Sequence, residues 1–229
     1  MEIRVLADAA AVAAEAAKVI AKEGRRAVMV RGRFTLAVSG GRTPWQMLRA
    51  LAREDIPWHN VYVAQVDERV APAGHPDRNL THLRDSLLEH APLRPEQVCA
   101  MPVQAPDLEA AAARYALMLH QIAGSPPVLD LVHLGLGLDG HTASLVPGDP
   151  VLSVTDADVA VTGLYQHRRR MTLTYPMLNR ARRILWVVTG AEKAAMLPRL
   201  RKRDATIPAG RIGQAHALVL ADRAAAAKL

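Results

Sequence analysis

The sequence has little cysteine, few aromatic residues and no long hydrophobic run. Cys99 is the only cysteine, which excludes an internal disulfide, and its apolar neighbours indicate a packed core thiol rather than a nucleophile. No segment approaches the roughly 20 apolar residues that a membrane-spanning helix needs. The short apolar segment at 9–14 lacks the basic leader of a secretory signal. We therefore expect a cytoplasmic protein without a membrane partner.

The scarcity of aromatic residues also limits what the positive charge can mean. A formal net charge of +7 is typical of nucleic-acid binding. However, aromatic residues make up 3% of the chain, so few side chains could stack on bases. The arginine clusters at 168–170, 180–183 and 199–203 are interspersed with apolar residues, as on solvated helix faces. We expect no nucleic-acid partner, although part of this charge could serve a small anionic substrate.

Strand-like and helix-like segments alternate along the chain. Half of the residues are hydrophobic, which is enough for a core without disulfides or metals. Strands are predicted at 34–38, 61–66, 129–134, 184–188 and 217–220, and helices at 8–23, from 43, at 80–89, 108–122 and 191–201. In the first helix, Asp8 is the expected N-cap and Gly24 the expected stop. Several strands are apolar throughout, which predicts an open, mainly parallel α/β sheet with helices on both faces. We expect residues 1–229 to form one domain, with an irregular segment at 146–163.

The segment Ser39–Pro44 directly follows the strand at 34–38. Thr43 is a candidate N-cap for the next helix, and two glycines let backbone N–H groups approach a ligand. Such a helix start attracts phosphate, although an ordinary tight turn explains the motif equally well. A nucleophile elbow at Ser39 is disfavoured because the usual first glycine is absent.

Asp139 and His141 follow the predicted strand at 129–134. The surrounding glycines form a G-x-G-x-x-G pattern, but prolines at 147 and 150 leave no room for the crossover helix of a dinucleotide site. A histidine beside a carboxylate is suited to general-base chemistry. No cysteine or histidine at ligand spacing accompanies the pair, so we expect no metal, and we interpret His133 as a core histidine.

Three further charged groups lie near predicted strand ends. Asp67-Glu68-Arg69 follows the strand at 61–66 and, taken alone, favours solvent exposure. Arg170 and Lys193 could likewise be plain surface charges. In a parallel sheet, however, all these positions fall near the carboxyl edge, where open α/β folds bind ligands. One cleft could hold a phosphate opposite His141, through Gly40, Gly41, Arg42, Thr43, Arg170 and Lys193.

Taken together, four motifs resemble the 6-phosphogluconolactonase family. They are Ser39–Pro44, Asp67–Arg69 with His75–Asn79, Gly137–Leu145, and Arg170–Thr174 with Leu178-Asn179, and the resemblance runs from Ser39 to Lys193. It implies hydrolysis of 6-phospho-D-glucono-1,5-lactone to 6-phosphogluconate in the pentose phosphate pathway, without a cofactor.

The resemblance also implies roles for individual residues. His141 would deprotonate the attacking water, and Asp139 would orient His141 or the substrate. Arg69 would stabilise charge on the carbonyl oxygen, while Asp67 positions sugar hydroxyls or Arg69. The phosphate would be held by Ser39, Gly40, Gly41, Arg42, Thr43, Arg170 and Lys193. We expect a monomer or a small homo-oligomer.

Two alternatives are related to this family. Glucosamine-6-phosphate deaminases resemble the chain, but they carry a glutamate where Val146 stands and favour tyrosine at the position of Arg69. A sugar-phosphate-sensing regulator would carry a DNA-binding module ahead of the sensor, and the first 33 residues offer no room for one. Arg78, Val146 and Gly210 depart from the usual lactonase pattern.

Overall fold

A parallel sheet forms the centre of the computed structural model, which describes residues 1–229. Its strand order is β1-β10-β9-β6-β2-β3-β5, and every neighbouring pair is parallel. The strands are β1 (Glu2–Leu6), β2 (Phe34–Val38), β3 (Val61–Gln65), β5 (Val98–Cys99), β6 (Leu131–Leu134), β9 (Ile184–Val188) and β10 (Ala217–Asp222). The prediction of an open, mainly parallel sheet is confirmed.

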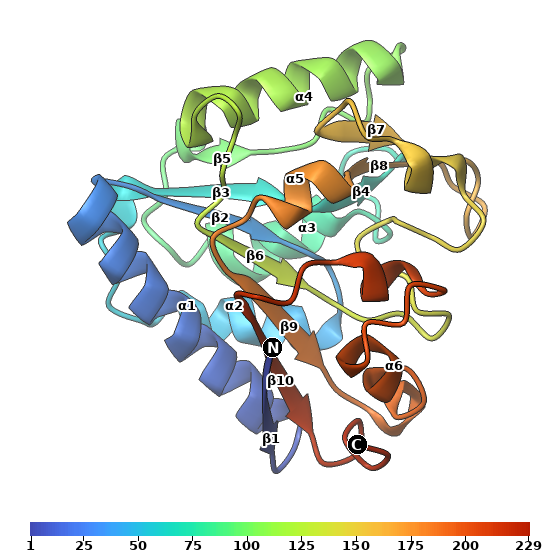
Figure 1. Cartoon of the computed structure of the whole chain (residues 1–229). Helices are drawn as coiled ribbons and strands as arrows, with labels where there is room; N and C mark the ends of the chain where they lie inside the picture. The colour runs from blue at the N-terminus through green and yellow to red at the C-terminus, as the bar shows by residue number, and fades with distance from the viewer.

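Helices cover both faces of this sheet (Figure 1). Helices α1 (Ala9–Arg31), α2 (Arg42–Leu51) and α3 (Asn79–Leu83) contribute to one hydrophobic cluster. Helices α4 (Leu108–Ala123), α5 (Tyr175–Asn179) and α6 (Leu197–Arg201) contribute to the other. Successive residues of β9 alternate between the two clusters, with Leu185 in one and Trp186 in the other. Because both faces are covered, the strands are apolar throughout rather than at every second residue.

Helix α1 begins as predicted and ends later than predicted. The Asp8 carboxylate accepts a hydrogen bond from the Ala11 N–H at 2.8 Å, as an N-cap does. Gly24 is not a stop, since the helix continues to Arg31 and ends at Gly32, whose φ is 73°. A Cβ at Gly24 would lie 3.1 Å from the Phe34 ring. This glycine therefore reflects close packing of helix on strand.

A small antiparallel sheet lies beside the carboxyl ends of the central strands. It consists of β4 (Asp67–Arg69), β8 (Arg170–Leu173) and β7 (Val159–Val161). The sequence did not indicate this sheet, because its strands are short and two of them carry charged residues. Part of the segment predicted as irregular, 146–163, is strand β7. The sheet pairs Arg69 directly with Arg170, which are 101 positions apart in the sequence.

Two predicted helices are interrupted. The segment at 80–89 divides into α3 and a π-helical turn (Arg84–Leu88). The segment at 191–201 divides into a 3-10 turn (Ala191–Lys193) and α6, which begins at Leu197. No helix in the protein is long and apolar enough to cross a membrane.

Candidate active site

A cavity of about 340 Å³ opens at the carboxyl edge of the central sheet. Its position is where the strand order changes direction, since the chain runs from β2 outward to β3 and β5 and later returns to β6 on the other side. Of the predicted site residues, Ser39, Gly40, Asp67, Arg69, His141, Arg170 and Lys193 line it. Gly41, Arg42 and Thr43 do not line it, and Asp139 lies behind His141.

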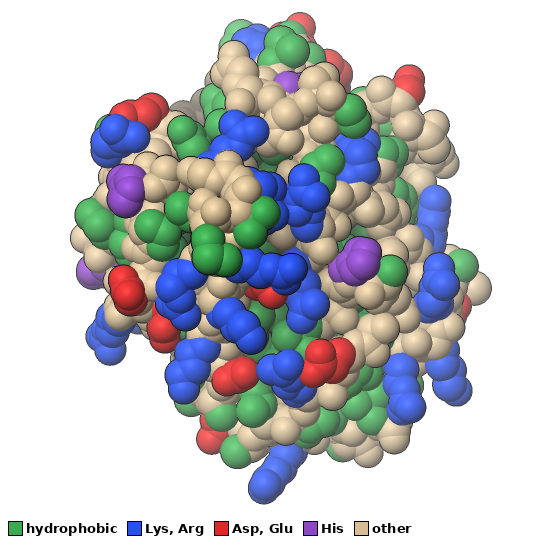
Figure 2. Space-filling model, turned by 60° about the vertical axis from the view of Figure 1, so that its left-hand side comes forward, with side chains coloured by type: hydrophobic (Ala, Val, Ile, Leu, Met, Phe, Trp, Pro, Cys, Tyr) green, Lys and Arg blue, Asp and Glu red, His purple; other side chains and the backbone are tan.

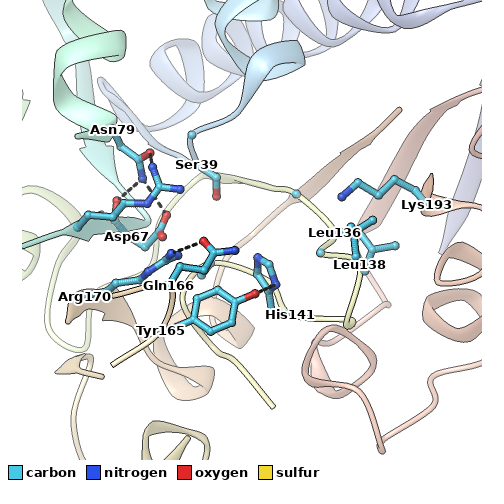
Figure 3. A pocket seen from close by; sticks show the side chains of 15 residues that line it. Ser39, Asp67, Asn79, Leu136, Leu138, His141, Tyr165, Gln166, Arg170 and Lys193 are labelled. Carbon is cyan, nitrogen blue, oxygen red and sulfur yellow. Dashed lines mark hydrogen bonds between the residues drawn. The ribbon is translucent and has the colours of Figure 1, made fainter. Parts of the chain in front are cut away.

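His141 and Asp139 form a hydrogen-bonded pair, and Figure 3 shows the His141 side chain on the cavity wall. His141 Nδ1 lies 2.6 Å from Asp139 Oδ1, and the same oxygen accepts the His141 backbone N–H at 3.0 Å. Burial alone would raise the pKa of Asp139, but the hydrogen bonds and charge of His141 together lower it. An ionised Asp139 requires the proton to be on Nδ1, which leaves Nε2 free as a base.

The backbone around this pair is shaped for the histidine. A Cβ at Gly137 would lie 2.1 Å from His141 Nδ1, so only glycine permits the ring to fold back over that position. The glycines of the G-x-G-x-x-G pattern therefore accommodate His141 and not a nucleotide. No group of three or more His, Cys, Asp or Glu side chains is arranged to hold a metal ion.

Tyr165 also contacts this pair, and no sequence motif predicted this contact. Its hydroxyl donates to Asp139 Oδ2 at 3.1 Å and lies 3.5 Å from His141 Nδ1. Burial raises the pKa of Tyr165, and so does the neighbouring Asp139 charge, which keeps the hydroxyl protonated. Tyr165 belongs to a tight hairpin in which Gln166 and His167 have positive φ without being glycine.

Asp67 and Arg69 are held by one asparagine at the opposite wall. Asn79 donates to the Asp67 backbone oxygen at 2.9 Å and accepts from Arg69 Nη1 at 2.8 Å. Asp67 Oδ2 accepts the Ser144 hydroxyl at 2.6 Å. A Cβ at Gly40 would lie 2.0 Å from Asn79 Oδ1, so glycine is required for this close approach. Asp67 is buried, which contradicts the solvent-facing interpretation of this motif.

Glu68 anchors this wall from behind. Both of its carboxylate oxygens accept backbone N–H groups, from Asn79 at 2.8 Å and Leu80 at 2.9 Å. The guanidinium of Arg78 lies 3.0 Å from Glu68, and both side chains are buried. Arg78, one of the departures from the usual lactonase pattern, therefore balances a buried charge and does not reach the cavity.

Arg170 contributes a buried positive charge to the cavity. Its Nη2 donates to Gln166 Oε1 at 2.9 Å, and its guanidinium lies over the Tyr165 ring at 4.7 Å. Burial lowers the pKa of Arg170, and the nearby charge of Arg69 lowers it further. The Nε atoms of Arg69 and Arg170 are both buried without a partner. Two adjacent guanidiniums with unsatisfied donors favour an anion in this space.

The Ser39 loop leads directly into α2. This helix begins at Arg42 with Gly41 as its N-cap, so the predicted capping by Thr43 is wrong. The Thr43 hydroxyl instead lies 2.6 Å from that of Thr189. Beneath the loop, His133 Nδ1 accepts the Ser39 N–H at 3.2 Å, while His133 Nε2 is buried without a partner. His133 is a core histidine as predicted, although only one of its nitrogens is hydrogen-bonded.

Comparison with known proteins identifies the family. The family model for glucosamine-6-phosphate isomerases/6-phosphogluconolactonase matches residues 7–220. A 6-phosphogluconolactonase from Synechocystis sp. is 40% identical over 73% of this chain and 71% of that protein. One from Nostoc sp. is 35% identical over 99% of this chain and 98% of that protein.

Solved structures agree in fold. A 6-phosphogluconolactonase from Thermotoga maritima superposes with a TM-score of 0.85 at 24% identity, covering 96% of this chain and 98% of that one. A monomeric glucosamine-6-phosphate deaminase gives the same TM-score of 0.85 at 21% identity, with 100% of both chains covered. At these identities the likeness shows the fold alone. The family-model match and the curated relatives place the chain in the family of glucosamine-6-phosphate isomerases and 6-phosphogluconolactonases.

Proposed function

We propose that the chain hydrolyses 6-phospho-D-glucono-1,5-lactone to 6-phospho-D-gluconate by general-base activation of water. The observation that carries this proposal is the His141–Asp139 pair, which faces a cavity also lined by Arg69, Arg170 and Lys193. The names of the curated relatives favour the same reaction. The activity is assigned to one domain of residues 1–229, since both hydrophobic clusters pack on the same sheet. We place it in the cytoplasm, in a monomer or small homo-oligomer.

His141 is the base in this mechanism. Asp139 holds Nδ1–H, and Nε2 takes a proton from a water that attacks the lactone carbonyl. Asp139 stabilises the imidazolium that forms, and Tyr165 fixes the carboxylate by donating to its second oxygen. The proton then passes from Nε2 to the ring oxygen as the C1–O5 bond breaks. A lactone is an activated ester, so positioned water and charge stabilisation suffice without a covalent intermediate.

Arg69 stabilises the negative charge that develops on the carbonyl oxygen. Asn79 holds its Nη1 group, and its buried Nε has no protein partner. A donor that is already held in place stabilises the tetrahedral state without having to reorient. Asp67 balances the positive charge of the two arginines and presents a carboxylate to the sugar hydroxyls.

The phosphate lies against the Ser39 loop in this proposal. The cavity is lined by Ser39, Arg170 and Lys193 (Figure 3), so both cations can contribute to binding an anion in it. Helix α2 begins directly after Gly41, and its free N–H groups and dipole add to the attraction. None of Gly41, Arg42 and Thr43 lines the cavity, so in this proposal they contribute through the dipole of the helix start and not through direct contact.

Deamination of glucosamine 6-phosphate is the second candidate, because structural similarity includes a deaminase. By resemblance to the deaminases, a glutamate would be expected at the position of Val146. A valine side chain has no carboxylate to assist ring opening, and Val146 is also buried and outside the cavity lining. We expect no ammonia release from glucosamine 6-phosphate.

The test follows the loss of freshly generated 6-phosphogluconolactone at near-neutral pH. The wild type should exceed the uncatalysed rate, and His141→Ala should lower kcat by about 10²–10⁴-fold because the general base is lost. His59→Ala is the matched control, since His59 is exposed and outside the cavity. A wild-type rate equal to the uncatalysed one would refute the function. Full activity in His141→Ala would refute the mechanism alone.

A further inference from the structure

A second hollow lies at the opposite, amino edge of the central sheet and has a volume of about 550 Å³. Several of the residues that line it lie just before strands of the sheet. Arg31 precedes β2, Asp130 precedes β6, Arg182 and Arg183 precede β9, and His216 precedes β10. The mechanism proposed for the carboxyl edge uses none of these residues. Because the hollow lies at the amino ends of the strands and the active-site cavity at their carboxyl ends, the two are separated by the length of the strands.

The lining of this hollow carries excess positive charge. Arg26, Arg31, Arg182 and Arg183 face only two carboxylates, those of Glu23 and Asp130. Arg180 also lines the hollow, but Asp158 pairs with it. Figure 2, turned so that the left-hand side of Figure 1 comes forward, shows lysine and arginine side chains gathered around a hollow near the centre of this side.

A single buried carboxylate organises the arginines. Asp130 Oδ2 accepts the Thr35 N–H at 2.9 Å and the Thr35 hydroxyl at 3.0 Å, which fixes the side chain. Its other oxygen, Oδ1, lies 2.8 Å from Arg31 Nη2 and 3.5 Å from Arg182 Nε. One charge is thus shared by two guanidiniums, which leaves both with free donors.

Arg183 adds an enclosed donor that nothing satisfies. Its Nε atom is buried and has no hydrogen-bond partner. The side chain lines both this hollow and a neighbouring one of about 250 Å³, which adds Lys18 and Lys22. This donor has no acceptor within the protein, and the guanidinium that carries it lines an open basic hollow. The positively charged surface formed by the two hollows is larger than a single phosphate group can contact.

We propose that this amino-edge hollow binds a linear oligophosphate, that is, an anion with two or more linked phosphate groups. Guanidinium groups match phosphate oxygens with paired hydrogen bonds. Several arginines around one hollow suit several linked phosphates better than a single one. The only hydrophobic lining residues are Val128 and Ala181, and His216 is the one ring, since no phenylalanine, tyrosine or tryptophan lines the hollow. The phosphate chain, and not an attached nucleoside, is therefore the recognised part.

Titration calorimetry with tripolyphosphate tests this site. The measurements use Arg170→Gln as the background, which removes a cation from the carboxyl-edge cavity. Arg182→Gln should weaken binding at least about 5-fold, and adding Arg26→Gln should weaken it further, because each removes a phosphate-binding cation. Arg201→Gln is the matched control, since Arg201 is exposed and outside the hollow. Thermal unfolding confirms that each variant is folded.

Three further ligands, namely ATP, adenosine and a DNA duplex, show which part of a ligand the hollow recognises. ATP should bind about as tightly as tripolyphosphate, and adenosine should not bind. Unchanged tripolyphosphate affinity in the Arg182→Gln and Arg26→Gln double variant would overturn the proposal. So would a DNA duplex that bound far more tightly than tripolyphosphate and depended on the same arginines, since that result would assign the hollow to nucleic acid. Lactone hydrolysis is independent of all these outcomes.

Discussion

The two edges of the central sheet are both rich in positive charge but are built differently. At the carboxyl edge, Arg170 and Asp67 are buried and hydrogen-bonded to neighbouring side chains. At the amino edge, Arg182 has 51% of its side chain exposed and shares the single buried carboxylate of Asp130. The buried arrangement fixes charges at defined positions, as bond-breaking chemistry requires. The exposed arrangement supplies attraction for an anion without a fixed orientation.

The largest difference between the two edges is expected from a matched pair of substitutions, one at each buried carboxylate. Asp67→Asn removes the negative charge that shares the cavity with Arg69 and Arg170, and we expect a fall in kcat/KM of about 100-fold or more. Asp130→Asn removes the corresponding buried carboxylate at the amino edge, and kcat/KM should stay within about twofold of the wild type. Each should lower the free energy of unfolding by about 1–3 kcal/mol, because charged hydrogen bonds are lost. Equal activity in the two variants would mean that the edges are not functionally distinct.

Acid should destabilise the protein through His133, which supports the carboxyl edge from within the sheet. Burial lowers its pKa from 6.5 to about 3, so the unfolded chain takes up a proton on this residue before the folded protein does. This contribution to stability is present above pH 6.5 and is lost as the pH falls towards 3. Between pH 7 and pH 4 the loss is about 3 kcal/mol.

The measurement is urea unfolding at both pH values. His133→Leu should be less stable at pH 7, since the Ser39 N–H loses its acceptor, but should lose less stability on acidification. His90→Leu serves as the exposed control and should follow the wild type. An identical pH dependence in wild type and His133→Leu would exclude His133 as the titrating group.

Tyr165→Phe gives the smallest expected effect and sharpens the account of the carboxyl edge. It removes the hydroxyl that donates to Asp139 but leaves the ring under Arg170. We expect kcat to fall about 10-fold with KM nearly unchanged, because Asp139 orients His141 less firmly. Tyr62→Phe, whose hydroxyl makes no hydrogen bond within the protein, should have no effect. A rise in KM without a change in kcat would assign Tyr165 to substrate binding instead.

Local sequence patterns predicted most of the central sheet. The strands at 34–38 and 184–188 coincide with β2 and β9, because each is a short apolar run between turn residues. The Asp8 cap is likewise local, since its carboxylate bonds to a residue three positions away. The predicted helix end at Gly24 was wrong because this glycine is explained by a long-range contact and not by a local one. Its small size serves packing against Phe34, which lies on another element.

In the candidate site, too, the local contacts were predictable from the sequence and the long-range contacts were not. Asp139 and His141 are two positions apart, so their contact could be predicted from the motif itself. Tyr165 lies 24 positions from His141, in a hairpin without a glycine to mark its turn. Asn79 and Ser144 lie 12 and 77 positions from Asp67. Contacts of this kind depend on how separate elements pack, and no local pattern encodes them.

Local sequence patterns were sufficient to predict most of the central strands and the longer helices, the mainly parallel sheet, the pairing of Asp139 with His141 and the resemblance to one enzyme family. Long-range packing accounts for the burial of Asp67, the position of Arg170 beside Arg69 and the contact between Tyr165 and Asp139. It also accounts for the gathering of arginines from separate segments around Asp130. The physical reason is that periodicity and turn residues act over a few positions, whereas burial and charge pairing depend on neighbours brought together by folding.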